Sequence, residues 1–253
     1  MATALVLAAH NSQRVCVTAA VAVLAGQLSI GWSNDLIDAE RDAKVGRTDK
    51  PLATGRLSRR TVTVALGLAL FITAIASSLL GWRAAAAQLT VVVSGLAYNS
   101  GVKSTIWSAV PYALAFGALP AVATLARPQP MWPAWWAMAA GATVGVAAHF
   151  ANVLPDLAED HHTGVRGLPH RLGASASAVA ATVFASGAVC LAFAGAATPA
   201  TTVQWMLLAG AGLSLACALL VLRRNPRSEA VFLTTMVVAA LAIALLVTGD
   251  VTG

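Results

Sequence analysis

The feature that most constrains the fold of this chain is a series of long apolar segments separated by short polar ones. Several of these segments reach the roughly 18 residues that mark a membrane-spanning helix. Only 10% of the residues are charged, whereas a soluble domain carries about 25%, and the sequence offers no polar helices to cover a soluble core. It therefore predicts an all-α integral membrane protein. The predicted spans are 15–32, 61–82, 84–98, 106–126, 134–154, 173–197, 201–222 and 230–248.

The loop charges indicate how these spans are oriented. If the side that holds 34–60 is the inside, thirteen Lys and Arg residues fall there and three fall on the other side. Cytoplasmic loops carry such an excess, so we expect the inside to be the cytoplasm. Nine of the ten acidic residues also fall inside. Because acidic residues contribute little to orientation, their position needs another cause.

A duplicated motif supplies that cause. The pattern Asn-x3-Asp-x3-Asp-x3-Gly-x4-Pro begins at Asn34 and again at Asn152, offset by 118 residues at every matched position. Four predicted spans separate the copies, so both return to the same membrane face. We expect a single domain over 1–253 with two parallel four-helix halves, at about 15–126 and 134–248. A short apolar stretch at 2–9 precedes the first span, and we expect it to be either the stub of a truncated ninth helix or the end of a helix whose true start lies upstream.

Each copy of the motif would gather oxygen atoms on one helix face. Asn34, Asp38 and Asp42 follow one another at intervals of four residues on a helix that continues out of the first span. Like charges at this spacing repel, so a cavity between two such faces requires cations. Oxygen ligands dominated by carboxylates favour Mg²⁺. The predicted metal ligands are Asn34, Asp35, Asp38, Asp42, Asn152, Asp156 and Asp160.

Basic residues beside the acids suit a diphosphate that would complete the metal coordination. Tyr98 and Lys103 fall at the cytoplasmic end of a span, where a lysine can neutralise a diphosphate and a tyrosine hydroxyl can donate to it. A snorkelling pair at the membrane interface explains these two residues equally well. The predicted diphosphate-binding residues are Asn34, Arg41, Lys44, Arg47, Lys50, Lys103 and Arg166. The predicted catalytic residues are Asp35, Asp38, Asp156, Tyr98 and Lys103.

Simpler interpretations of the polar residues were weighed. A loop of mixed charge is usually a solvated surface with weak ion pairs, but that predicts neither the duplication nor the spacing of the acids. His149 lies in an apolar segment, and we interpret it as a packed, hydrogen-bonded histidine in preference to a ligand.

These motifs resemble those of the UbiA superfamily of intramembrane prenyltransferases. NDLIDAERD, from Asn34, is similar to the NDxxDxxxD motif of that family, and KPLATGRLS is similar to its RPLxxGxxS segment. NVLPDLAEDHHTGVRGLPHRLG, from Asn152, resembles its DxxxDxxxG…LPxxLG segment, and YNSGVK resembles its Tyr/Lys motif. The resemblance implies a nine-helix bundle and Mg²⁺-dependent transfer of a prenyl group from a prenyl diphosphate to an acceptor, usually an aromatic one.

Two residues depart from the family pattern. Asn152 stands where the family often has Asp, which implies weaker metal binding there, and Lys50 stands where Arg is usual, which removes a bidentate phosphate contact. Two other activities stay open: a terpene cyclase of the same family, which needs no acceptor, and an ion-coupled transporter, although transporter acids tend to lie in mid-span. The expected partners are a prenyl diphosphate, a lipophilic or aromatic acceptor and membrane lipid. No nucleic acid is expected, because the bases lie in short loops between spans.

Overall fold

The computed structural model describes residues 5–6, 11–155, 157, 166–195, 200–224 and 229–249. Within these ranges the chain forms eight α-helices and one short 3-10 helix, and no strand. The elements are α2 (Gln13–Lys44), α3 (Arg59–Ser78), α4 (Trp82–Asn99), η1 (Val102–Ser104), α5 (Val110–Leu125), α6 (Trp135–Val153), α8 (Leu168–Gly195), α9 (Thr202–Arg224) and α10 (Glu229–Thr248). The prediction of an all-helical bundle is confirmed.

Helix α2 carries the first acidic motif. It continues past the predicted end of its span at Trp32 as far as Lys44, so the motif occupies its last turns, as the spacing predicted. The Ser12 side chain caps the start of the helix by accepting a hydrogen bond from Val15 N at 3.4 Å. The helix stops just before Gly46, whose φ of 73° lies in the left-handed region that favours glycine. The chain then turns back towards α3.

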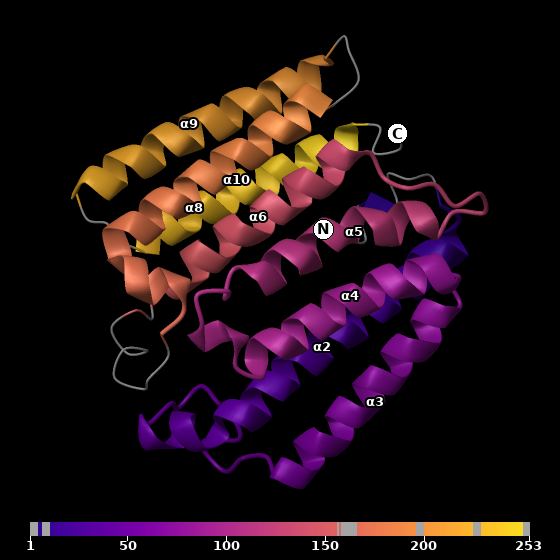
Figure 1. Cartoon of the computed structure of the whole chain (residues 1–253), viewed down its shortest axis with the longest axis vertical. Helices are drawn as coiled ribbons and strands as arrows, with labels where there is room; N and C mark the ends of the chain where they lie inside the picture. Colours follow the sequence, from indigo (N-terminus) through magenta and orange to yellow (C-terminus); the bar gives the residue numbers. More distant parts are fainter. Residues whose placement is uncertain are drawn as a thin grey trace.

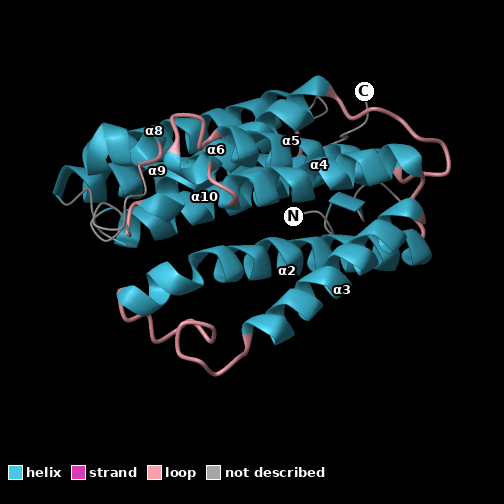
Figure 2. Ribbon diagram, turned by 60° about the horizontal axis from the view of Figure 1, so that its bottom comes forward, coloured by secondary structure: helices cyan, strands magenta, loops and turns pink. Residues whose placement is uncertain are grey.

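The helices lie side by side, and the loops gather at the two ends of the bundle (Figures 1 and 2). Helix α2 packs against α3 and α4, α4 packs against α5, and α5 packs against α6. Helices α8 and α10 cover α6, and α9 packs outside α10 and α8. The turns after α2, the region of η1 and the start of α8 lie together at the left-hand end of the bundle in Figure 1. The two motif-bearing parts of the chain therefore reach the same end.

Glycine residues let pairs of helices approach closely. An added Cβ at Gly95 of α4 would lie 2.5 Å from the Ile30 side chain of α2. An added Cβ at Gly141 of α6 would lie 2.6 Å from the carbonyl oxygen of Phe116 on α5, and one at Gly145 would overlap the carbonyl oxygen of Tyr112. Small residues at helix contacts are the usual means of close packing in membrane bundles. Helix α6 therefore lies directly on the backbone of α5.

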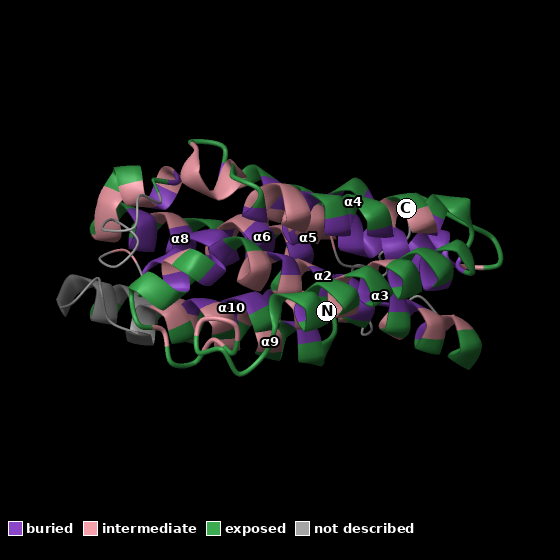
Figure 3. Ribbon diagram, turned by 90° about the horizontal axis from the view of Figure 1, so that it is seen from below, coloured by how far each residue is buried: buried purple, intermediate pink, exposed green. Residues whose placement is uncertain are grey.

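The outer faces of the bundle are apolar. Among the described residues, α2, α3 and α8 are long and apolar enough to cross a membrane, and Val110–Leu125, Thr202–Cys217 and Phe232–Thr248 are shorter apolar helices. Large apolar side chains such as Phe71 and Leu213 are exposed, and exposed positions cover the outsides of the helices (Figure 3). Apolar surface of this extent suits contact with lipid.

The contact between α5 and α6 predicts the effect of one small substitution. Gly145→Ala should lower the unfolding temperature in detergent, because overpacking of this kind costs about 1–3 kcal/mol. The matched control is Gly67→Ala on α3, where an added Cβ meets nothing within 4 Å. Differential scanning fluorimetry compares the two. Equal unfolding temperatures for both variants would contradict the close contact.

Candidate active site

A pocket of about 330 Å³ opens between α2, α4, α5 and α6. Its lining is apolar in part, with Val91, Ala115 and Phe116, and it also receives polar side chains from all four helices. These polar residues are Gln27, Asn34, Tyr98, Asn99, Tyr112 and Asn152. Asn34 and Asn152, which begin the two copies of the motif, therefore lie at one pocket.

Asp38 lies one turn beyond Asn34 and is only 5% exposed. Lys103 Nζ donates to its two carboxylate oxygens at 2.7 and 2.6 Å, and to Asn34 Oδ1 at 3.4 Å. Arg41 Nη2 donates to Asp38 Oδ2 at 3.0 Å. A carboxylate this deeply buried is stable only when it is paired and hydrogen-bonded. These contacts join the end of α2 to the η1 turn.

The other acids of the first motif are also close to basic side chains. Asp35 Oδ1 accepts a hydrogen bond from Lys50 Nζ at 2.7 Å. Asp42 is 4% exposed, with Oδ1 3.6 Å from Arg41 Nη2. Within the part of the chain that the structure describes, no three His, Cys, Asp or Glu side chains are grouped to hold a metal. Of the acids that share a helix face in the sequence, Asp35 pairs with Lys50, while Asp38 and Asp42 share Arg41.

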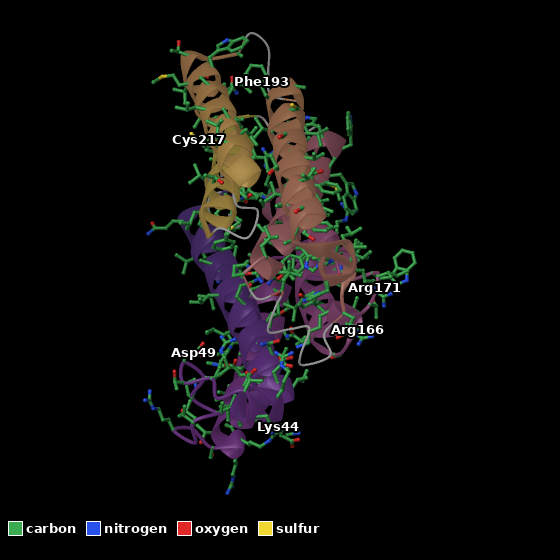
Figure 4. All side chains as sticks on the ribbon, turned by 90° about the vertical axis from the view of Figure 1, so that its left-hand side faces the viewer. Lys44, Asp49, Arg166, Arg171, Phe193 and Cys217 are labelled. Atoms are coloured by element: carbon green, nitrogen blue, oxygen red, sulfur yellow. The ribbon has the colours of Figure 1, made fainter. Side chains whose placement is uncertain are left out.

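The remaining predicted residues are paired with other acids, exposed, or outside the described residues. Arg47 donates two hydrogen bonds to Asp49, at 2.9 and 2.8 Å. Hydrogen bonding from the Arg47 side chain lowers the pKa of the exposed Asp49 carboxyl to about 2. Lys44 and Arg166 are exposed. In Figure 4 both lie in the lower part of the view, with Asp49, well away from Phe193 and Cys217. Asp156 and Asp160, predicted as metal ligands, lie outside the described residues.

Three polar pocket residues, Gln27, Asn99 and Tyr112, were not predicted from the sequence. Asn99 Nδ2 donates to the Ile30 carbonyl at 2.8 Å and to Ser33 Oγ at 3.3 Å, and so fixes α4 to α2 beside Asn34. The ring of Tyr112 meets Tyr98 edge-on, with centroids 5.2 Å apart. The chain has only two tyrosines, and both line this pocket. Their scarcity was a usable signal, since an isolated tyrosine at the end of an apolar span needs a polar partner.

The oxygen atoms beside the pocket suit a hard divalent cation. Both carboxylate oxygens of Asp38 and the amide oxygen of Asn34 converge on a single cationic atom, Lys103 Nζ. Asn152 contributes a further amide to the pocket lining. Mg²⁺ is usually held by one or two carboxylates, with phosphate oxygens and water completing its shell. The donor set fits such an ion.

The fold and the pocket define a helical membrane protein with a polar site near one end of its bundle. The sequence matches the model of the UbiA prenyltransferase family over residues 1–241, so the chain belongs to that family. Members of this family are integral membrane proteins, and the chain is one of them. The resemblance stated from the motifs is confirmed.

Solved structures share the fold at low sequence identity. The apo structure of a UbiA homolog from Aeropyrum pernix K1 has a TM-score of 0.78 and 18% identity, over 97% of this chain and 94% of that chain. A UbiA homolog from Archaeoglobus fulgidus bound to GPP and Mg²⁺ has a TM-score of 0.62 and 14% identity, over 97% of this chain and 94% of that chain. The structure of a digeranylgeranylglyceryl phosphate synthase has a TM-score of 0.66 and 14% identity, over 99% of this chain and 91% of that chain. No curated protein matches the sequence.

The Asp38–Lys103 pair predicts a coupling that can be measured by thermal unfolding. Lys103→Met should destabilise the protein by about 1–3 kcal/mol, because it leaves a buried carboxylate with fewer hydrogen bonds. Asp38→Asn should destabilise the Lys103→Met variant less than it destabilises wild type, because that variant has already lost the ion pair. Lys44→Met, at an exposed position of the same region, is the control. Additive effects of the two substitutions would show that the pair is not formed.

Proposed function

We propose that the protein is a Mg²⁺-dependent prenyltransferase that transfers a prenyl group from a prenyl diphosphate to a lipophilic or aromatic acceptor within the membrane. The observation that carries the proposal is that Asn34 and Asn152 line one pocket, beside the cluster of Asp38, Arg41 and Lys103. The excess of basic residues in the loops at this end of the bundle supports a site at the cytoplasmic face.

The relatives support the substrate class and the ion. The UbiA homolog from Archaeoglobus fulgidus was solved with GPP and Mg²⁺ and also with DMAPP and Mg²⁺. Both ligands are prenyl diphosphates, and both were found together with the same ion. Together with the family membership of this chain, they support a prenyl diphosphate as its substrate and Mg²⁺ as its cofactor.

The residues proposed to hold the ion come from both copies of the motif. They are Asn34, Asp35, Asp38 and Asp42 on α2, with Asn152, Asp156 and Asp160 from the second copy. Bound Mg²⁺ would supply a Lewis acid that offsets the charge of the diphosphate. The ion pairs with Lys50 and Lys103 hold the Asp35 and Asp38 carboxylates in place. With the ion on these carboxylates, the two lysines would bind phosphate oxygens.

The basic side chains would act on the leaving group. In the reaction, the bond between the allylic carbon and the diphosphate oxygen breaks, and its electron pair leaves with the diphosphate. Lys103 and Arg41 stabilise the negative charge that develops there. Lys50, which pairs with Asp35, would be a further contact. Lys44, Arg47 and Arg166 are proposed as outer contacts. The acceptor then forms a bond to the allylic carbon and loses a proton.

The aromatic residues of the pocket would stabilise the positive charge on the prenyl carbon. Tyr98, Tyr112 and Phe116 line the pocket, and the rings of Tyr112 and Phe116 stack with centroids 6.3 Å apart. Aromatic faces attract positive charge, and an apolar lining keeps water away from a reactive carbon. The Tyr98 hydroxyl is the proposed hydrogen-bond donor to the diphosphate.

Removal of a proposed metal ligand should abolish turnover. We expect Asp38→Ala and Asp156→Ala each to reduce product formation from radiolabelled GPP by about 100-fold or more, because each removes charge that organises the leaving group. Glu40→Ala is the matched control, since Glu40 is an exposed acid on the same helix. Turnover retained by both aspartate variants would refute the proposal.

The ion itself is tested by chelation. Excess EDTA should stop the release of pyrophosphate from GPP, and added Mg²⁺ should restore it. The assay is run with and without phenolic or quinone-precursor acceptors, and products are identified by mass spectrometry. A prenylated acceptor is the expected product. A cyclic hydrocarbon formed without any acceptor would instead identify a terpene cyclase, and turnover unaffected by EDTA would contradict the role of Mg²⁺.

A further inference from the structure

Ser108 lies between η1 and α5 and is fully buried, with 0% of its surface exposed. Its Oγ accepts a hydrogen bond from the backbone N–H of Leu168, at the start of α8, at 2.9 Å. The same atom lies 3.0 Å from His149 Nε2 on α6. One hydroxyl group thus connects the turn that follows α4 to two helices of the second half of the chain. We call these contacts the Ser108 bridge.

The backbone beside the Ser108 bridge is packed as closely as its side chains. An added Cβ at Gly167 would overlap the carbonyl oxygen of Lys103 and would lie 3.0 Å from Ser108 Oγ. The residue before α8 therefore rests directly on the backbone of Lys103. Since Lys103 Nζ contacts Asp38 and Asn34, any shift of this backbone moves the ammonium group relative to α2.

His149 supports Ser108 from α6. It is 1% exposed, and its ring packs against the rings of Tyr98 and Tyr112, with centroid distances of 5.7 and 4.9 Å. The interpretation of His149 as a packed, hydrogen-bonded histidine agrees with its contact to Ser108. Asn152 follows one turn later on the same helix and lines the pocket. The position of Ser108 is thereby tied to the helix that delivers the second copy of the motif.

We propose that Ser108 is a positioning residue for the diphosphate site: its hydroxyl, oriented by His149, holds the Lys103 turn in register with the start of α8. This inference rests on the proposed function, in which Lys103 binds the diphosphate. The segment that carries Asp156 and Asp160 rejoins the described chain at Arg166, directly before Gly167. The Ser108 bridge therefore also holds the residue that follows Arg166, the first described residue after that segment. A displacement of about 1 Å can cost 100-fold in rate where reacting groups must be aligned.

The test is the affinity of the purified full-length protein for GPP and for inorganic pyrophosphate, each with Mg²⁺, measured by calorimetry in detergent. Ser108→Ala should weaken both affinities and raise the KM for GPP by about tenfold, because Lys103 loses its fixed position. Gly167→Ala should do the same, because its Cβ displaces the Lys103 backbone although no hydrogen-bonding group is removed. The control is Ser100→Ala, because the Ser100 hydroxyl bonds only to the Leu96 carbonyl of its own helix.

Substitutions of His149 separate positioning from general stability. His149→Leu should weaken pyrophosphate binding as Ser108→Ala does, and His149→Gln, which keeps a polar group near Ser108, should restore part of it. The double variant S108A/H149L should bind no more weakly than S108A, because S108A already removes the contact between Ser108 and His149. The inference is overturned if S108A binds like wild type, or if it lowers only the unfolding temperature. Failure of wild type itself to bind GPP and pyrophosphate would instead overturn the proposed function, and this inference with it.

Discussion

The structure of the site depends on the pairing of one buried carboxylate, Asp38, with Lys103 and Arg41. A charged group close to the hydrocarbon of a membrane is costly unless it is paired, and the repeated acids at the end of α2 would otherwise repel one another. Because Lys103 reaches both Asp38 and Asn34, the pairing sets the position of the turn after α4 relative to α2. The pocket is formed between α2, α4, α5 and α6, so its polar end is defined by the same contacts.

The second half of the chain reaches this cluster through close backbone contacts. Gly141 and Gly145 place α6 directly on α5, which brings Asn152 to the pocket. Gly167 places the start of α8 on the backbone of Lys103, and Ser108 adds hydrogen-bonding contacts at the same point. Each of these contacts depends on a small residue, and each connects an element of one half to an element of the other. The meeting of Asn34 and Asn152 at one pocket therefore results from packing as well as from the number of spans between them.

Much of this arrangement was predictable from the sequence. The apolar segments indicated the helices, the four-residue spacing indicated that α2 continues through the motif, and the even number of spans indicated that Asn34 and Asn152 meet at one end. The partner of each acid was not predictable. Spacing shows that Asp35, Asp38 and Asp42 share a helix face, but Lys50 and Lys103 reach them from turns 15 and 65 residues away. Ser108 gave little signal because its role depends on contacts between elements. The division into two repeated halves stays a prediction.

The central claim is that both copies of the motif bind one ion-bridged diphosphate, and the most direct measurement is the binding of Mn²⁺ followed by electron paramagnetic resonance. Mn²⁺ accepts the same oxygen ligands as Mg²⁺ and is visible to this method. The account predicts that inorganic diphosphate increases the amount of Mn²⁺ bound to wild-type protein, and that Asp38→Asn and Asp156→Asn each remove this increase. If either variant binds as much Mn²⁺ as wild type in the presence of diphosphate, the two copies do not share a site and the account is wrong.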